Sequence, residues 1–199
     1  MWKQSHTWNL HNYCQSLYCY DMFQFLTIEP IITALLPLDT VSIRGENLTL
    51  RCLTVGSFVD SYLWEKNGSI IGNSDTLDII VDASSGGIYT CAVSNDAGSD
   101  SSTTTLYVAP YIDTSLEKET LTASKSILDI SCDATGFPAP SVIWVDTQGL
   151  EVSNTSQLQF SPVMFGDEGQ YYCLATTEIN GTDFTAMDET TLIGDNTII

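Results

Sequence analysis

Basic residues are scarce in this chain. Its 199 residues include 6 Lys and Arg against 25 Asp and Glu, which gives a net charge of −19. A protein that binds nucleic acid neutralises phosphates with Lys and Arg, so the composition argues against that class. An anionic membrane surface would repel the chain for the same reason. The acidity predicts a self-repelling, solvated surface; the functional alternatives are a basic partner and Ca²⁺, but no calcium-loop motif supports the second.

Long apolar runs are also missing. The most apolar region, Met22 to Leu38, is interrupted by Glu29, Pro30 and Pro37. A spanning helix needs roughly 18 or more consecutive apolar residues, so we expect no direct membrane insertion by this chain. The polar stretch from Gln4 to Tyr13 occupies the place where a secretory signal would have its apolar run. The sequence therefore carries neither a convincing anchor nor a convincing export signal.

Catalytic constellations are absent from most of the chain. Both histidines, His6 and His11, lie near the N-terminus, so the remainder offers no Ser-His-Asp or Cys-His arrangement. The best-placed carboxylate pair, Asp167 and Glu168, is assigned to a turn of the fold. No phosphate-binding or dinucleotide glycine motif occurs. We expect a protein that is not an enzyme and needs no cofactor.

Residues 1 to 34 stand apart as a leader of uncertain structure. His6, His11, Cys14 and Cys19 are residue types that bind zinc, but their spacing matches no established zinc motif, so no metal site is predicted. A disulfide between Cys14 and Cys19 is one alternative. A disordered leader, or a misassigned start of a longer chain, is the interpretation we favour.

The rest of the chain is an internal duplication. Three landmark residues occur in each unit, namely Cys52, Trp64 and Tyr89 in the first and Cys132, Trp144 and Tyr171 in the second. The two Cys and the two Trp are each 80 residues apart, and the two Tyr are 82 apart. A further cysteine, Cys91 or Cys173, follows two residues after each Tyr. Three landmarks in register indicate a duplicated domain.

The local pattern of both units is typical of β-structure. Leu48, Leu50 and Cys52 alternate with polar residues, and such short alternating runs separated by Gly, Asn and Ser indicate half-buried antiparallel strands. The dipeptides Asn67-Gly68 and Asn180-Gly181 favour two-residue hairpin turns. No long segment has helical periodicity. The sequence therefore predicts an all-β chain of sandwich domains.

These landmarks resemble the core of the immunoglobulin superfamily. The resemblance implies two tandem immunoglobulin-like antiparallel β-sandwiches with Greek-key connections, of the I-set or C2 type. It also implies disulfides between Cys52 and Cys91 and between Cys132 and Cys173. In that family the Trp packs on the disulfide and the Tyr hydroxyl bonds to nearby backbone, which implies these roles for Trp64, Trp144, Tyr89 and Tyr171. Ser85 occupies a position where the family usually has Asp, so one turn contact that this Asp makes in the family is not predicted for the first domain.

The expected domains span residues 35–109 and 110–195. The last strand of the first domain is expected to end near Val108, and Ala109-Pro110 then forms a short, stiff joint because proline restricts its own backbone and that of its predecessor. An elongated rod of two domains follows. No flexible Gly/Ser linker lies between the two units.

The expected function is protein binding outside the cell. Four glycosylation sequons support an extracellular or cell-surface glycoprotein, namely those at Asn47, Asn67, Asn154 and Asn180. The resemblance implies an adhesion or receptor module that recognises a protein partner, either its own kind or another cell-surface or matrix protein. The alternative is a structural segment of a longer immunoglobulin array in matrix or muscle.

Overall fold

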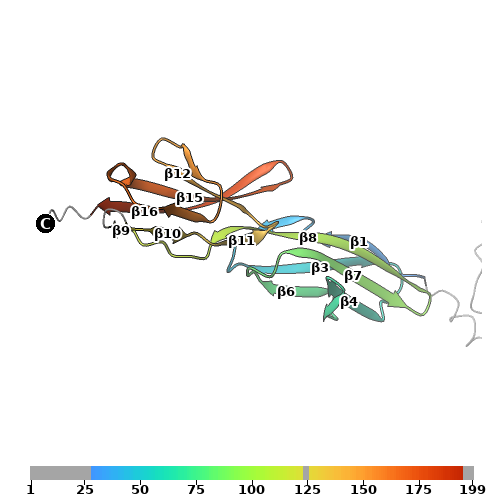
Figure 1. Cartoon of the computed structure of the whole chain (residues 1–199). Coiled ribbons are helices and arrows are strands. Elements are labelled where there is room, and N and C mark those ends of the chain that lie inside the picture. Colours follow the sequence, from blue (N-terminus) through green and yellow to red (C-terminus); the bar gives the residue numbers. More distant parts are fainter. Residues whose placement is uncertain (1–27, 123–125, 195–199) are drawn as a thin grey trace, which may run out of the picture.

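Two β-sandwiches follow one another along an elongated molecule (Figure 1). This computed structural model describes residues 28–122 and 126–194. The strands of the first sandwich are β1 (Ile31–Leu36), β2 (Thr40–Ser42), β3 (Asn47–Val55), β4 (Ser61–Lys66), β5 (Ser69–Gly72), β6 (Thr76–Ile80), β7 (Gly87–Asn95) and β8 (Gly98–Ile112). Its two sheets are β1-β3-β6 and β8-β7-β4-β5, with β2 parallel to β8.

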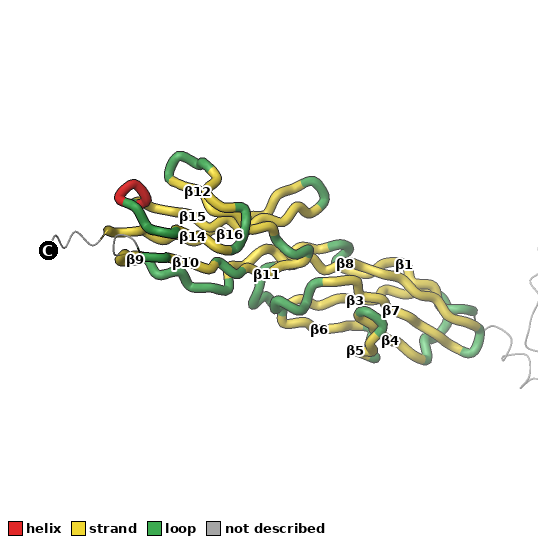
Figure 2. Tube along the Cα trace, viewed as in Figure 1, coloured by secondary structure: helices red, strands yellow, loops and turns green. Residues whose placement is uncertain are grey.

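The second sandwich repeats this layout. Its elements are β9 (Glu119–Thr122), β10 (Leu128–Ser131), β11 (Ala134–Phe137), β12 (Ser141–Asp146), β13 (Glu151–Ser153), β14 (Gln157–Phe160), the 3-10 turn η3 (Phe165–Asp167), β15 (Gly169–Ile179) and β16 (Thr182–Gly194). β10 pairs with β14, and the other sheet has the order β13-β12-β15-β16-β9. Figure 2 shows η3 as the single helical segment of the described chain. The predicted pair of β-sandwiches is confirmed.

A disulfide lies inside each sandwich. Cys52 is bonded to Cys91 and Cys132 to Cys173, so the two bridges implied by the family resemblance are present. Each bridge closes a loop of about 40 residues, which stabilises its domain by roughly 4 kcal/mol on the chain-entropy estimate. Beside each bridge a tryptophan is fully buried.

The indole N–H of each buried tryptophan donates a hydrogen bond. The indole nitrogen of Trp64 donates to the carbonyl of Ser74 at 2.9 Å, and that of Trp144 donates to the carbonyl of Ser156 at 3.4 Å. A buried N–H without a partner would cost about 1–3 kcal/mol. The repeated contact to the loop that precedes β6 in one domain and β14 in the other therefore lets a large ring fill each domain centre.

The corner tyrosines close the same turn in both domains. The hydroxyl of Tyr89 donates to the carbonyl of Ser85 at 2.6 Å, and that of Tyr171 donates to the carbonyl of Asp167 at 3.0 Å. The Ser85 hydroxyl accepts the amide of Asp82 at 2.9 Å, as the Asp167 carboxylate accepts the amide three residues before it at 2.7 Å. Ser85 therefore replaces the usual aspartate without loss of the turn contact.

The two predicted hairpin turns are confirmed. Asn67 and Gly68 join β4 to β5 with φ values of 51° and 77°, and Asn180 and Gly181 join β15 to β16 with φ values of 52° and 77°. A type I′ turn requires positive φ at both central residues, and its twist matches that of the flanking strands.

The first sandwich begins before residue 35. β1 starts at Ile31, which pairs with Val55 of β3, so residues 31–34 belong to the sheet and not to a leader. The flanking prolines that interrupt this apolar run, Pro30 and Pro37, bound the strand because proline cannot donate to a sheet ladder. The N-terminal end of the first domain is therefore an edge strand held between two prolines.

A buried threonine anchors the crossover from β1 to β2. Thr104 of β8 is 2% exposed, and its hydroxyl accepts the Asp39 amide at 3.0 Å and donates to the Pro37 carbonyl at 3.1 Å. The Asp39 carboxylate in turn accepts the amide of Thr105 at 2.9 Å. These contacts tie the loop between the two sheets to the last strand of the domain.

The last strand of the first sandwich does not end near Val108. β8 continues through Pro110 to Ile112, and β11 of the second sandwich pairs with it on both sides of this proline. Pairing shifts register opposite Pro110, where a Cβ on Gly136 would lie 3.2 Å from the proline Cα. A glycine opposite the proline lets the backbones approach, and so the strand crosses the expected joint without a loop.

Candidate protein-binding face

Five side chains form an apolar patch on the outside of the second sandwich. Ile143, Leu174 and Met187 lie opposite one another in one row across β12, β15 and β16, and Val145 and Tyr172 are paired two positions along. They alternate with core-facing residues, so they point away from the core. Met187 is 63% exposed and the others are partly exposed. We call these five residues the apolar face.

The matching rows of the first sandwich have a different character. Leu63, Ala92 and Ser101 lie in register across β4, β7 and β8, at the positions equivalent to the main row of the apolar face. In the next row Glu65 pairs with Thr90. Leu63 matches Ile143, but the positions of Leu174, Met187, Val145 and Tyr172 hold Ala92, Ser101, Glu65 and Thr90 in the first sandwich. Because the same fold accommodates small and polar side chains at these four positions, the larger apolar residues there are not required for folding.

Carboxylates border the apolar face. Glu178 lies directly opposite Asp183 near the tip of the β15–β16 hairpin, and Glu151 lies opposite Val145. Like charges directly opposite each other in a sheet are destabilising. No basic side chain of the described residues forms an ion pair with Glu178 or Asp183. The border therefore keeps an uncompensated negative charge.

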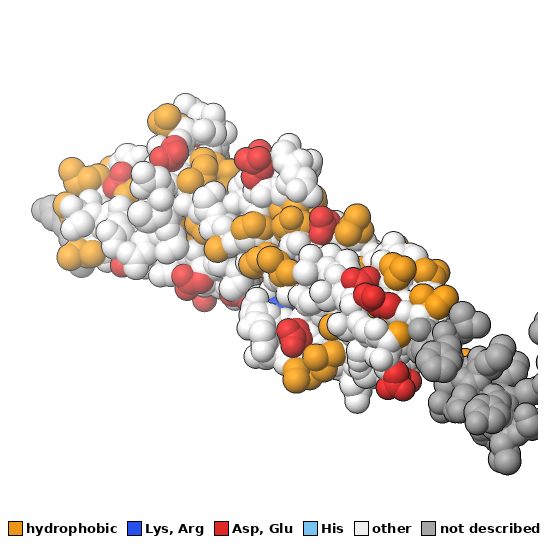
Figure 3. Space-filling view, turned by 90° about the vertical axis from the view of Figure 1, so that its right-hand side faces the viewer, with side chains coloured by type: hydrophobic (Ala, Val, Ile, Leu, Met, Phe, Trp, Pro, Cys, Tyr) orange, Lys and Arg blue, Asp and Glu red, His pale blue; other side chains and the backbone are white. Residues whose placement is uncertain are grey.

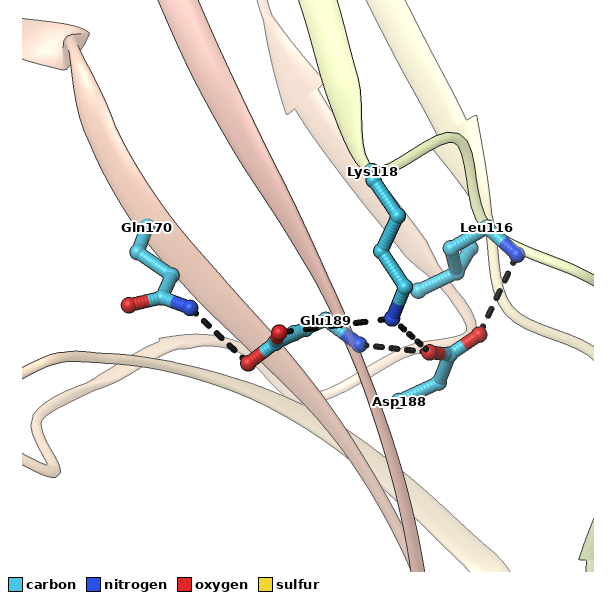
Figure 4. A network of polar contacts seen from close by, with 5 residues as sticks. All are labelled: Leu116, Lys118, Gln170, Asp188 and Glu189. Carbon is cyan, nitrogen blue, oxygen red and sulfur yellow. Dashed lines mark hydrogen bonds and ion pairs between the residues drawn. The ribbon is translucent and has the colours of Figure 1, made fainter.

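A polar network orders one edge of the face (Figure 4). Lys118 lies 3.2 Å from a carboxylate oxygen of Asp188 and 4.0 Å from one of Glu189, and Gln170 donates to Glu189 at 2.8 Å. Partial burial alone would raise the pKa of Asp188, but hydrogen bonds from the amides of Glu189 and Leu116 and from Lys118 hold it below its usual value. Glu189 pairs with Tyr172 of the apolar face, so this network fixes a charged group at its border.

Negative charge extends over the rest of the surface. On the side shown in Figure 3, acidic side chains are scattered over the molecule and basic ones are barely visible. Within residues 28–122 and 126–194, no group of three or more His, Cys, Asp or Glu side chains could hold a metal ion. The acidity of the described chain is therefore dispersed.

The four sequon asparagines are all exposed. Asn47 begins β3, Asn67 and Asn180 occupy hairpin turns, and Asn154 lies in the loop between β13 and β14. None of them belongs to the apolar face. The metal-type residues of the leader, His6, His11, Cys14 and Cys19, lie outside the described residues.

Two family models, each describing an immunoglobulin domain, match this chain over residues 29–108 and 109–177. The chain belongs to the immunoglobulin superfamily. The two matched regions meet within β8, beside the boundary at 109/110 that the sequence predicts. The exact division between the two immunoglobulin domains stays a prediction, since this strand is shared by both.

Several known proteins contain a segment similar to this chain. Hemicentin-1 of Homo sapiens is 29% identical over 162 residues, which are 70% of this chain and 3% of that protein. Netrin receptor DCC of Homo sapiens is 27% identical over 170 residues, covering 75% and 12%. Muscle M-line assembly protein unc-89 of Caenorhabditis elegans is 28% identical over 205 residues, covering 81% and 2%. The chain thus spans a small part of each relative's length.

A solved structure supports the immunoglobulin fold. The N-terminal four immunoglobulin domains of Dscam1 isoform 7.44 match with a TM-score of 0.60 at 20% identity, over 84% of this chain and 46% of that one. Identity this low bears on the fold alone. In the part of this chain that the structure describes, no helix is long and apolar enough to cross a membrane.

Sequence analysis missed the apolar face and the contacts at the domain junction. Alternation shows which residues share a side of a strand, but a row such as Ile143, Leu174 and Met187 emerges only from the register of three strands. A usable signal was present at one position: the residue after the second landmark Cys is Ala92 in one unit but Leu174 in the other.

Proposed function

We propose that this chain is an extracellular protein-binding module of a cell-adhesion or receptor protein, and that the apolar face contacts the partner. The row of Ile143, Leu174 and Met187 carries this proposal, because exposed apolar side chains in register form a continuous contact surface. Tyrosine and methionine are enriched at protein interfaces, whereas Lys and Glu are depleted there. The similarity to a netrin receptor agrees with a binding role. We propose no enzymatic activity.

The border charges favour a partner that is not a second copy. Glu151, Glu178 and Asp183 would approach equally acidic groups in a symmetric pair, and each chain carries a net charge of −19. Complementary charge across an interface speeds association and disfavours wrong partners. A protein surface with an apolar centre and Lys or Arg around it matches this face.

The test is a binding screen with a matched pair of variants. The chain is measured by surface plasmon resonance against a panel of purified secreted and cell-surface ectodomains. Met187→Gln should weaken each specific interaction by about tenfold, since replacing the most exposed apolar side chain of the face by a polar one should cost roughly 1.4 kcal/mol of binding free energy. Ser101→Gln, at the equivalent position of the first domain, should leave it unchanged. Binding that is indifferent to Met187→Gln would refute the assignment of the face.

The location and modification of the chain belong to the same proposal. We infer that Asn47, Asn67, Asn154 and Asn180 carry glycans, which their exposure supports, and that the disulfides form in an oxidising compartment. After expression in animal cells behind a secretion signal, glycosidase and reductant should each shift the mobility of the secreted chain on a gel. Mobility unchanged by both treatments would contradict this location.

A structural segment of a longer immunoglobulin array is the second candidate. The similarity to a muscle M-line assembly protein and the continuous strand through the domain junction favour it. An array segment needs no dedicated partner on its sheet faces. Two results together would favour this candidate. The apolar face would find no binding partner in the screen, and Met187→Gln would change neither the stability of the domains nor the distance between them.

A further inference from the structure

The two domains share a continuous backbone junction. β11 of the second domain pairs with β8 at Val108 and at Tyr111, which lie on either side of Pro110. Phe137, at the end of β11, packs against the core of the first domain. A Cβ on Gly86 would lie 2.1 Å from the Cβ of Phe137, so the ring occupies space that any larger residue at Gly86 would fill. The second domain thus inserts a side chain into the first.

Arg44 contacts the second domain from the loop between β2 and β3. Its guanidinium carbon lies 4.2 Å from the centroid of the Tyr111 ring. One terminal nitrogen is 2.7 Å from a carboxylate oxygen of Asp113, and the other donates to the hydroxyl of Thr135. Thr135 and Tyr111 pair with each other in the β11–β8 ladder, and Asp113 directly follows β8, so the three partners are close together.

Arg44 and Asp113 form a partly exposed ion pair, with 28% and 33% of their side chains accessible. Partial burial alone would raise the pKa of Asp113, but hydrogen bonds from Arg44 and Thr135 and the charge of Arg44 hold it below its usual value. The Nε of Arg44 is buried and has no hydrogen-bond partner in the described residues. An unpartnered buried donor lowers stability, so the remaining contacts of Arg44 hold the side chain there in spite of that cost.

We propose that Arg44 fixes the angle between the two immunoglobulin domains, so that the tandem behaves as one rigid body. A planar guanidinium can stack on a ring and direct two donors sideways at the same time, which a lysine ammonium cannot do. The ring, the carboxylate and the hydroxyl then constrain the domain angle in different directions. Phe137 prevents separation along the axis, and Arg44 prevents bending.

Residual dipolar couplings of the weakly aligned full chain test this assignment. In the wild type, couplings from both domains should fit a single alignment tensor. Arg44→Ala and Arg44→Lys should both lose this common tensor, with the two domains then giving tensors of different magnitude. Arg51→Ala is the matched control, because Arg51 is an exposed basic residue of β3 in the same domain; it should keep the common tensor.

Three outcomes would overturn the proposal. A common tensor in Arg44→Ala would show that the strands alone fix the angle. A common tensor in Arg44→Lys would show that charge suffices, and its loss in Arg51→Ala would show that net charge matters and not the contact. Unchanged indole signals of Trp64 and Trp144 establish that a variant is folded. Thr135→Val removes one contact only, and should reduce the agreement of the two tensors even if Arg44→Ala does not fold.

Discussion

The hydroxyl of Thr104 offers a sharp test of what holds the first domain together. Thr104→Val keeps the shape of the side chain but removes its hydroxyl, which leaves the amide of Asp39 and the carbonyl of Pro37 without their partner. Leaving a buried polar group unsatisfied costs about 1–3 kcal/mol. The added methyl recovers about 0.8 kcal/mol of apolar burial. Two such groups less the methyl contribution give about 1–5 kcal/mol, and because both contacts are only part-buried we expect a net loss toward the low end, about 2 kcal/mol.

The second domain supplies the control. Thr190 lies opposite Tyr171, as Thr104 lies opposite Tyr89, and it is equally buried, but its hydroxyl has a single contact of 3.3 Å to the hydroxyl of Thr120. Thr190→Val should therefore cost no more than about 0.5 kcal/mol, which is the low end for one neutral hydrogen bond.

Domain-resolved unfolding distinguishes the two effects. The indole N–H signals of Trp64 and Trp144 report separately on the two cores during urea titration followed by NMR. Thr104→Val should lower the midpoint for the Trp64 signal and, by the usual scaling for a small domain, the melting temperature of that domain by roughly 8–16 °C. Equal effects of the two valine substitutions would refute the role given to the crossover contacts.

Three further changes have defined outcomes. Gly86→Ala should place a methyl group against Phe137 and lower the melting temperature by an amount equivalent to about 1–3 kcal/mol of overpacking, measured by differential scanning calorimetry. Replacing Cys52 and Cys91 together by Ala should cost the first domain roughly 4 kcal/mol, measured by urea unfolding. The pKa of Asp188 is lower in the folded state, so its contribution is present above about pH 4 and is lost as pH falls through the folded pKa. In Asp188→Asn the urea midpoint of the second domain should depend less steeply on pH over this acid range. A pH dependence equal to that of the wild type would contradict the role assigned to Asp188.

The sequence predicted those features that depend on short-range patterns. The hairpin turn at Asn67-Gly68 could be predicted because both central residues of such a turn need positive φ, and this requirement concerns two neighbouring positions only. The cysteines, each about 40 residues from its partner, were assigned through the family pattern in which they stand. Ser85 could only be flagged as a departure, since its equivalence to aspartate depends on where its hydroxyl points.

Features built from distant residues were not predictable in this way. Arg44 meets Asp113 across 69 positions and Thr135 across 91, and no periodicity connects them. The end of β8 was placed too early because a proline usually terminates pairing; here Gly136 accommodates Pro110 across the ladder. The contacts that were not predicted and the strand end that was wrong both lie at the junction, where the two units are no longer equivalent and the internal repeat gives no information.

The internal repeat separates what folding requires from what function can use. At inward positions the two domains carry the same side chains, with Trp64 matching Trp144 and Tyr89 matching Tyr171, because the same disulfide-centred core must be filled twice. At outward positions one row differs: Ala92 and Ser101 of the first domain correspond to the larger apolar Leu174 and Met187 of the second. Single exposed apolar side chains are ordinary on a protein surface, but apolar side chains in register form a contiguous area that is stabilised when another surface covers it. This divergence of an outer row, set against the equality of the inner ones, is the reason we propose the binding role for the second domain, with the first orienting it through the junction at Arg44.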